Sequence, residues 1–372
     1  MHGPAAGPRR VVVLTLPLGN GHTAAAHLIA SVLRRDGTRV GVYDPSEGMF
    51  SLFPLGKVLR RFYRFAVGWR DGAVHVALYR FADRHPAATA KAVGILFRRR
   101  FRSWLASIGP ADAFVSTFSL LGHLLAEAGR APVVCFVTDA GTVNRIWFQG
   151  AVEKYIVPDA DSRATALRCG VDGERVSLVR PPMSAGGEVD QQQARRRLHL
   201  EDRFTVLVTG GGAGLGRGVL DAARALVTAG TDVQLLLNAG TNAELRREFT
   251  ELRAAAGGRC TVTGFSPDFP LMLAACDLVV GKAGWLTLNE AMSARRPTLI
   301  VDVVPGQEEG NCSFAEGARV GRRVDPGDVP EAVRRYAASE SALGEDFSFT
   351  DDRLSPAWAD EMTEDLKRTL TG

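Results

Sequence analysis

Residues 208–218 read VTGGGAGLGRG, and this stretch decides the fold class. The apolar, β-branched run at 204–209 leads into its glycines, and a helical pattern that reaches residue 229 follows them. A strand, a glycine-rich turn and a helix in this order are typical of a Rossmann-like unit, whose turn brings bare amides to a phosphate at the helix N-terminus. The stretch has no Gly-Lys-Ser/Thr and is therefore not a P-loop.

The same order occurs near the start of the chain. An apolar run at 11–16 precedes PLGNGHTAAAH at 17–27 and a helical pattern at 23–35. The other expected strands, separated by helical stretches, lie at 39–43, 114–116, 133–138, 154–157, 233–238, 260–263, 278–281 and 298–301. Strands that alternate with helices predict parallel sheets joined by crossover helices.

The two patterns are separated by RPPMSAGGEVDQQQ at 180–193, where paired prolines and glycines leave little to bury. The sequence therefore predicts an α/β protein with two Rossmann-like domains. We place the first domain at 1–182 and the second at 183–350. The tail, 351–372, is expected to form a last helix at 358–370 that crosses back to the first domain.

Composition narrows the class of protein. A chain of 372 residues is longer than one ordinary domain and suggests two. Its five cysteines are scattered without a CxxC pair, which favours a reducing compartment and no metal cluster. We see no signal peptide and no run of 18 apolar residues, so we expect a cytoplasmic protein without a spanning helix. Any membrane contact is then peripheral, on the inner face of the cell membrane.

Positive charge is concentrated in one window. Residues 49–105 hold 12 Lys and Arg against only Asp71 and Asp83, in a chain whose net charge is +4. Eleven of the 28 aromatic residues fall in the same window. Basic and aromatic side chains together favour an anionic, partly apolar surface such as a membrane, although a solvated helix face gives a similar pattern. We expect no nucleic-acid partner, because the charge is local and no known reading module is present.

The first candidate site is the glycine loop of 17–27. Gly19, Asn20 and Gly21 are expected to form an acceptor-binding loop, with His22 beside it at the carboxyl end of a strand. An imidazole there can take a proton from a bound hydroxyl near neutral pH, which makes His22 the candidate general base. By spacing alone, a solvated loop histidine explains the pattern as well.

The same loop also fits a dinucleotide-binding fingerprint. Gly19, Gly21 and Ala24 form GxGxxA, and Asp44 ends the next strand about twenty residues later. An NAD-dependent oxidoreductase is therefore the alternative of another class. Against it, His22 would crowd the pyrophosphate, and the turn at 208–218 would have no role.

The second domain offers a nucleotide site. The amides of Gly211, Gly212 and Gly214 suit a diphosphate without needing a lysine. In GKAGWLTLNEA at 281–291, Gly284 and Thr287 can offer an amide and a hydroxyl to phosphate oxygens. Glu290, one turn into the following helix, can accept both hydroxyls of a ribose, although a helix-face glutamate is commonly just solvated.

Polar residues follow the strand at 298–301. In VPGQEEGN at 304–311, Gln307, Glu308 and Asn311 lie within one or two turns of each other. Selecting a hexose by its hydroxyls requires such hydrogen-bonding groups. Taken alone, a polar loop explains them equally well, and their place beside the candidate phosphate site favours a sugar contact.

These motifs together resemble the monogalactosyldiacylglycerol synthase branch of the GT-B glycosyltransferases (family 28), relatives of the enzyme that adds N-acetylglucosamine to the lipid II precursor. The resemblance covers most of the chain, in matching order: GNGH, VTD at 137–139, TGGGAGLG, TGF at 263–265, KAGWLTLNEA and PGQEEGN. It implies a GT-B fold with a central cleft, His22 as the base, residues 211–214 at the diphosphate and Glu290 at the ribose. It also implies that Phe265 lies by the uracil of a UDP-sugar.

The chain departs from that family on the acceptor side. GNGH replaces GGGH, Thr23 stands where an arginine usually follows, and the His-Pro after VTD is missing, with Asn144 in that region. Asp139 remains and is a second candidate catalytic residue that orients His22 or the acceptor, although a strand-end aspartate also caps turns.

The sequence thus predicts an inverting glycosyltransferase that moves a hexose from a UDP-sugar to a diacylglycerol-like lipid hydroxyl, with no cofactor and no metal. A soluble natural-product acceptor is the alternative for the same chemistry. A further alternative function is a non-catalytic regulator that binds UDP without turnover.

Overall fold

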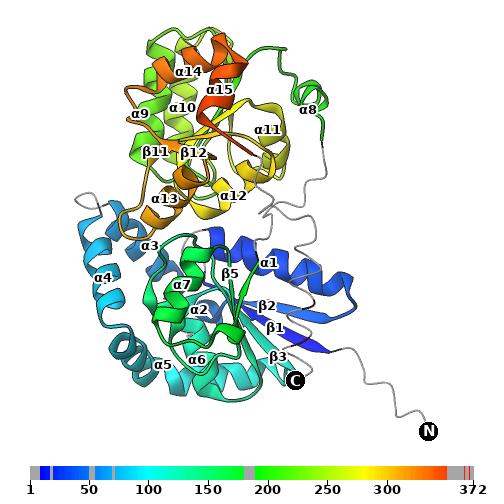
Figure 1. Ribbon diagram of the computed structural model, residues 1–372, viewed down its shortest axis with the longest axis vertical. Helices are drawn as coiled ribbons and strands as arrows, with labels where there is room; N and C mark the ends of the chain where they lie inside the picture. Colours follow the sequence, from blue (N-terminus) through cyan, green and yellow to red (C-terminus); the bar gives the residue numbers. More distant parts are fainter. Residues whose placement is uncertain are drawn as a thin grey trace. The chain divides into compact units, whose positions relative to one another are not determined.

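The computed structural model describes residues 9–16, 20–49, 55–68, 72–179 and 189–349, with the single positions 364 and 368. The chain divides into two compact units (Figure 1). Unit 1 comprises Met1–Pro181, Pro305–Gln307 and Ser355–Gly372. Unit 2 comprises Pro182–Val304 and Glu308–Leu354. Each is built around one parallel sheet.

The sheet of unit 1 has six strands in the order β2-β1-β3-β4-β5-β6. Every pair of neighbours is parallel. The strands are β1 (Arg10–Leu14), β2 (Arg39–Tyr43), β3 (Ala113–Ser116), β4 (Val133–Phe136), β5 (Lys154–Val157) and β6 (Val176–Leu178). The four central strands are almost wholly buried, as expected for short apolar strands covered on both faces.

Helices connect these strands. The described residues of the crossover from β2 to β3 form four of them, and this crossover carries the basic window of the sequence. The helices of unit 1 are α1 (Asn20–Arg35), α2 (Pro45–Gly48), α3 (Leu55–Gly68), α4 (Ala73–Arg84), α5 (Pro86–Ile108), α6 (Ser119–Ala128), η1 (Arg145–Phe148), α7 (Ala160–Arg168) and η2 (Gly173–Arg175). No helix among the described residues is both long and apolar enough to cross a bilayer.

The sheet of unit 2 also has six parallel strands, in the order β12-β11-β10-β7-β8-β9. They are β7 (Thr205–Thr209), β8 (Gln234–Asn238), β9 (Cys260–Thr263), β10 (Leu278–Lys282), β11 (Thr298–Asp302) and β12 (Gly321–Arg323). The helices are α8 (Gln191–Arg197), α9 (Arg217–Thr228), α10 (Ala243–Ala255), α11 (Phe269–Ala275), α12 (Trp285–Ser293), α13 (Glu309–Gly317), α14 (Val329–Ala338) and α15 (Glu340–Asp346).

The α/β class with two parallel sheets is confirmed. Each sheet packs an apolar core against its helices, with Phe101 and Tyr155 among the buried side chains of unit 1 and Phe249 and Tyr336 among those of unit 2. The sequence did not predict the short strands β6 and β12, because three residues are too few for a period-two pattern. The helix expected at 358–370 lies outside the described residues, except that positions 364 and 368 are helical.

One local expectation was wrong. Helix α1 begins at Asn20, so Asn20 and Gly21 lie in its first turn and not in a loop. The three alanines at 24–26 favour helix strongly, and asparagine is a common residue where helices begin. A Cβ on Gly21 would meet nothing within 4 Å, so no close contact within the protein requires a glycine there.

Candidate active site

The strand order of unit 1 reverses between β1 and β3. Strand β2 continues the sheet beyond β1 on one side, and β4, β5 and β6 continue it beyond β3 on the other. Ligands of open α/β sheets bind at the carboxyl ends of the strands where this reversal occurs. His22 follows β1 and Thr117 follows β3, so both belong to that edge. Thr138 follows the neighbouring strand β4.

These three residues form one hydrogen-bonded group, which we call the histidine site (His22, Thr117 and Thr138). The Nδ1 atom of His22 lies 2.9 Å from the carbonyl oxygen of Thr117 and 2.8 Å from the hydroxyl oxygen of Thr138. The hydroxyl of Thr117 donates to the backbone carbonyl of His22 at 3.0 Å. The ring also packs edge-on against Phe118, with centroids 5.2 Å apart. The imidazole is therefore fixed from several sides.

These contacts determine the protonation of His22. Burial lowers its pKa to about 4, although the hydrogen bond to Thr117 acts in the opposite direction. The ring is thus neutral near pH 7. Because a carbonyl oxygen can only accept, Nδ1 carries the proton and Nε2 carries the lone pair. A neutral imidazole in this tautomer is the form that a general base requires.

Neither Thr117 nor Thr138 stands out in the sequence. Both are common residue types at strand ends, and their role depends on the order of strands β1, β3 and β4 in the sheet. The VTD motif contains Thr138, yet the motif drew attention to its aspartate. In the structure, Asp139 follows Thr138 and is half-buried.

Asp139 lies near the half-buried phenol of Tyr79. Burial raises the pKa of Tyr79, and the negative charges of Asp139 and Asp83 raise it further. Asn144 is buried nearby and donates from Nδ2 to the backbone carbonyl of Tyr79 at 3.0 Å. Asn144 thus holds α4 against the segment that follows β4. A catalytic role for Asp139 stays a prediction.

Of the three predicted acceptor-loop residues, the structure describes two, Asn20 and Gly21. Asn20 and Gly21 stand two positions and one position before His22 in the first turn of α1, where the N–H groups have no partners within the helix. Gly19 lies outside the described residues. Any contact of these three with an acceptor stays a prediction.

The strand order of unit 2 reverses between β7 and β10. The turn after β7 is compact, with the amide of Gly214 donating to the carbonyl of Gly211 at 2.9 Å. Gly211 and Gly214 have φ of 72° and 59°, and a Cβ on Gly214 would lie 2.1 Å from the carbonyl oxygen of Ala239. Glycine is therefore required here. The carbonyl of Gly212 accepts from the amide of Thr241 at 2.9 Å.

The turn after β10 lies against the turn after β7. A Cβ placed on Gly211 would be 3.2 Å from the hydroxyl oxygen of Thr287, which lies in the first turn of α12. Gly284 is the N-cap residue of that helix. Gly211, Gly284 and Thr287, which are far apart in sequence, therefore meet at the strand reversal. Backbone amides and a hydroxyl beside a helix N-terminus suit an anion.

Glu290 and Phe265 provide two further groups in unit 2. Glu290 is on α12, and burial raises the pKa of its carboxyl group to about 8. Phe265 follows β9 and is 66% exposed. A half-buried carboxyl group and an open aromatic face are groups that bind a nucleoside well.

The three candidate sugar-binding residues of 304–311 have different surroundings. Asn311 is fully buried, and its Nδ2 donates to the carbonyl of Ala283 at 3.0 Å, so it positions the turn before α12. Glu308 is also buried, forms an ion pair with Lys282 and accepts from the amide of Val304 at 3.1 Å. Gln307 belongs to the segment Pro305–Gln307, which groups with unit 1. Sugar contacts by Gln307, Glu308 and Asn311 stay predictions.

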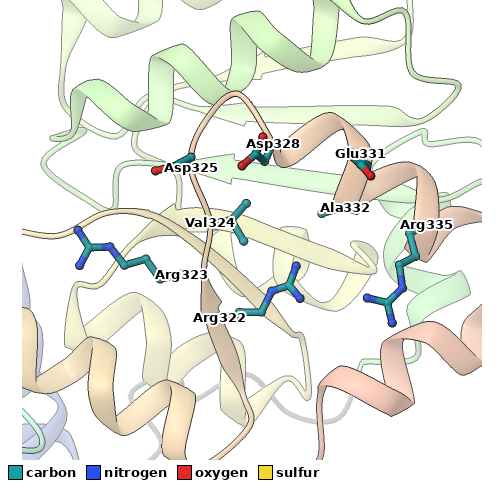
Figure 2. Close-up of a pocket in the computed structure, with 8 residues that line it drawn as sticks. All are labelled: Arg322, Arg323, Val324, Asp325, Asp328, Glu331, Ala332 and Arg335. Carbon is teal, nitrogen blue, oxygen red and sulfur yellow. The ribbon is translucent and has the colours of Figure 1, made fainter.

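A separate hollow of about 690 Å³ lies beside β12 and the start of α14 (Figure 2). Three arginines and three acidic residues line it, so its charges balance. Arg322 and Arg335 both donate to the same carboxylate oxygen of Asp346, at 3.3 and 2.9 Å. None of the residues that form the two turns described above lines this hollow.

Two family models match different parts of the chain. The model of the C-terminal domain of glycosyltransferase family 28 matches residues 205–311, which contain both glycine turns and α12. The model of monogalactosyldiacylglycerol (MGDG) synthase matches residues 22–183, which begin at His22. Together the two matches span most of the chain. The two matches support a GT-B glycosyltransferase of family 28. It is therefore an enzyme that transfers a sugar.

Individual relatives agree with this assignment. A probable monogalactosyldiacylglycerol synthase 2 of rice (Oryza sativa subsp. japonica) is 25% identical over 360 residues, covering 89% of this chain and 74% of the rice protein. A processive diacylglycerol beta-glucosyltransferase of Bacillus mycoides is 22% identical over 337 residues, covering 85% and 82%. The solved structure of HepE from Anabaena in complex with UDP and glucose is 14% identical, with a TM-score of 0.53 and coverage of 96% and 99%. The fold of this family 28 enzyme is GT-B, as the sequence predicted.

The oxidoreductase alternative is set aside by the family assignment. Asp44, which that alternative assigned to a ribose, is the N-cap residue of α2 and accepts from the amide of Ser46 at 2.8 Å. A strand-end aspartate that caps the next helix is a common structural feature, and spacing alone could not distinguish it from a ribose ligand.

Proposed function

We propose that this family 28 enzyme transfers a hexose from a UDP-sugar to the hydroxyl group of a diacylglycerol-like lipid, with His22 as the general base. The observation that carries the proposal is the position of Nδ1 of His22, which lies within hydrogen-bonding distance of the carbonyl oxygen of Thr117 and the hydroxyl oxygen of Thr138. The lone pair on Nε2 remains to accept a proton.

The reaction is a direct displacement. His22 Nε2 accepts the proton of the acceptor hydroxyl as its oxygen forms a bond to the anomeric carbon of the sugar. The bond between that carbon and the diphosphate oxygen breaks, and UDP leaves with the electron pair. Attack opposite to the leaving group inverts the configuration. The carbonyl of Thr117 and the hydroxyl of Thr138 stabilise the imidazolium that forms, because both accept from Nδ1.

The proposed donor site is the strand reversal of unit 2. The amides of the turn that contains Gly211, Gly212 and Gly214 would face the diphosphate, together with Gly284 and Thr287 at the start of α12. Phe265 would stack on the uracil, and Glu290 would accept the ribose hydroxyls. The UDP bound to HepE, which has the same fold, supports this choice of nucleotide.

The proposed acceptor is a lipid, because the rice and Bacillus relatives are named for diacylglycerol products and substrates. The exposed apolar residues of unit 1 support a membrane surface. Seven of the ten exposed large hydrophobic side chains in the described part of the chain lie on α3, α4 and α5: Val58, Phe62, Phe65, Leu78, Phe81, Ile95 and Leu96. Exposed arginines of the same helices, such as Arg84 and Arg98, would bind anionic headgroups. We call this the α3–α5 surface.

The test is UDP release from a panel of UDP-hexoses, each with and without anionic liposomes that contain diacylglycerol. The proposal expects release that requires one donor and the lipid together, and a glycolipid as product. Donor binding without lipid-stimulated release would indicate a soluble acceptor instead. No binding of any UDP-sugar would refute the donor part of the proposal.

A further inference from the structure

Lys282 is the last residue of β10, at the strand reversal of unit 2. The pairing of β10 with β11 is irregular at this point, because Gly281 pairs with Ile300 whereas Lys282 pairs with Asp302. Such bulges redirect a side chain at the end of a strand. The Lys282 side chain is only 15% exposed, so the ammonium group is largely removed from water.

The ammonium group of Lys282 lies among the backbone of both glycine turns. A Cβ placed on Gly284 would be 2.8 Å from Nζ of Lys282, and one placed on Gly211 would be 3.8 Å from its Cε. A side chain at Gly284 would therefore displace the ammonium group. The lysine thus occupies the space between the turn after β7 and the N-terminus of α12.

A positive charge is unfavourable beside a helix N-terminus unless an anion lies with it. In this structure the anion is the buried carboxylate of Glu308, which forms an ion pair with Lys282. Asp302 is close to the same pair. Burial raises its pKa, the charge of Glu308 raises it further, and the charge of Lys282 lowers it. A diphosphate in this position would meet two carboxylates, and Lys282 would offset their repulsion.

We propose that Lys282 binds the diphosphate of the donor and neutralises the negative charge that develops as UDP leaves. Glu308 then serves to hold the ammonium group in position when no nucleotide is bound. This inference rests on the proposed UDP-sugar donor, and it changes the expectation that amides alone hold the diphosphate. In the sequence, the phosphate contacts of 281–291 are assigned to Gly284 and Thr287, and Lys282 has no assigned role.

The experiment compares the affinity for UDP with that for uridine, which lacks the diphosphate. Replacing Lys282 alone would leave Glu308 buried without a partner, so the informative protein is the double variant Lys282→Met/Glu308→Gln. The single variant Glu308→Gln is its matched partner, because it retains the lysine. We expect the double variant to lose about tenfold or more in UDP affinity, as for a charged hydrogen bond, with uridine affinity unchanged. Glu308→Gln should retain the preference for UDP.

Arg217→Met provides a control at the same strand reversal. Arg217 begins α9, directly after the glycine turn, and its side chain is 94% exposed, so its removal should leave the ratio of the two affinities unchanged. An equal ratio in the wild-type protein and the double variant would overturn the role of Lys282. Equal loss of UDP and uridine binding would also overturn it, because the lysine would then be structural. A wild-type protein that binds neither would refute the UDP donor itself.

Discussion

The hydroxyl oxygen of Thr138 lies 2.8 Å from Nδ1 of His22, although 116 residues separate them in the sequence. The two residues meet because β3 pairs with β1 on one side and with β4 on the other, so the ends of these strands form one edge. Thr117 at the end of β3 completes the group. The orientation of the proposed base is therefore a property of the sheet order.

Replacement of His22 by alanine should abolish most turnover and leave UDP binding intact. A general base contributes on the order of 100-fold or more to the rate, and His22 belongs to unit 1 whereas the proposed nucleotide site belongs to unit 2. Turnover and UDP affinity are measured on the same preparation. His27→Ala is the matched control, because His27 is exposed on the same helix α1. Retained turnover in His22→Ala would remove His22 from the mechanism.

Thr138→Val should lower kcat about fivefold with little effect on KM, because one hydrogen bond to Nδ1 is lost while the side-chain shape is kept. The imidazolium loses an acceptor in this variant, so the pKa of His22 should fall further. The acid limb of the pH–rate profile should then move to lower pH. Thr138→Ser should restore the wild-type profile. A uniform loss of protein stability without a change in this profile would assign Thr138 a structural role only.

The sequence predicted the parallel sheets and brought attention to His22, because both depend on local patterns: alternating strands and helices, and glycines beside a strand end. It did not predict Thr117, Thr138 or Lys282, since their roles arise from contacts between segments far apart in the chain. The helical first turn of α1 was also missed. There the glycines favoured a loop, whereas the alanines at 24–26 stabilise a helix.

Acid should destabilise the wild-type protein more than His22→Gln. The pKa of His22 is lowered from 6.5 to about 4 in the folded state, so the unfolded chain binds a proton first as the pH falls below 6.5. Stability that is present above pH 6.5 is lost between pH 6.5 and 4, by about 2 kcal/mol at pH 5. Urea-unfolding midpoints of both proteins at pH 7 and pH 5 provide the measurement. Parallel shifts in the two proteins would contradict the lowered pKa.

Substitutions on the α3–α5 surface should reduce membrane binding without affecting the donor site. Leu78 and Phe81 of α4 are 52% and 58% exposed, so Leu78→Ser/Phe81→Ser removes apolar area at little cost to folding. We expect weaker co-sedimentation with anionic diacylglycerol liposomes and unchanged UDP affinity. Leu178→Ser is the control, since Leu178 is 46% exposed on β6. Equal co-sedimentation of all three proteins would refute the membrane surface.

Nucleoside binding should strengthen as the pH rises towards 8. Burial raises the pKa of Glu290 from 4.5 to about 8, so the free enzyme carries a neutral carboxyl group at pH 7. A carboxylate accepts both ribose hydroxyls, whereas a carboxylic acid has one donor and fewer acceptor sites, so binding favours loss of the proton.

Affinity should therefore fall as the pH decreases below 8, by at most tenfold per pH unit, and level off above it. Uridine is the suitable ligand, because phosphate groups titrate near pH 6 and would obscure the effect. Glu290→Gln should bind uridine more weakly at pH 8.5 and without this pH dependence. If the wild-type affinity is the same at pH 6 and pH 8.5, Glu290 does not bind the ribose as a carboxylate.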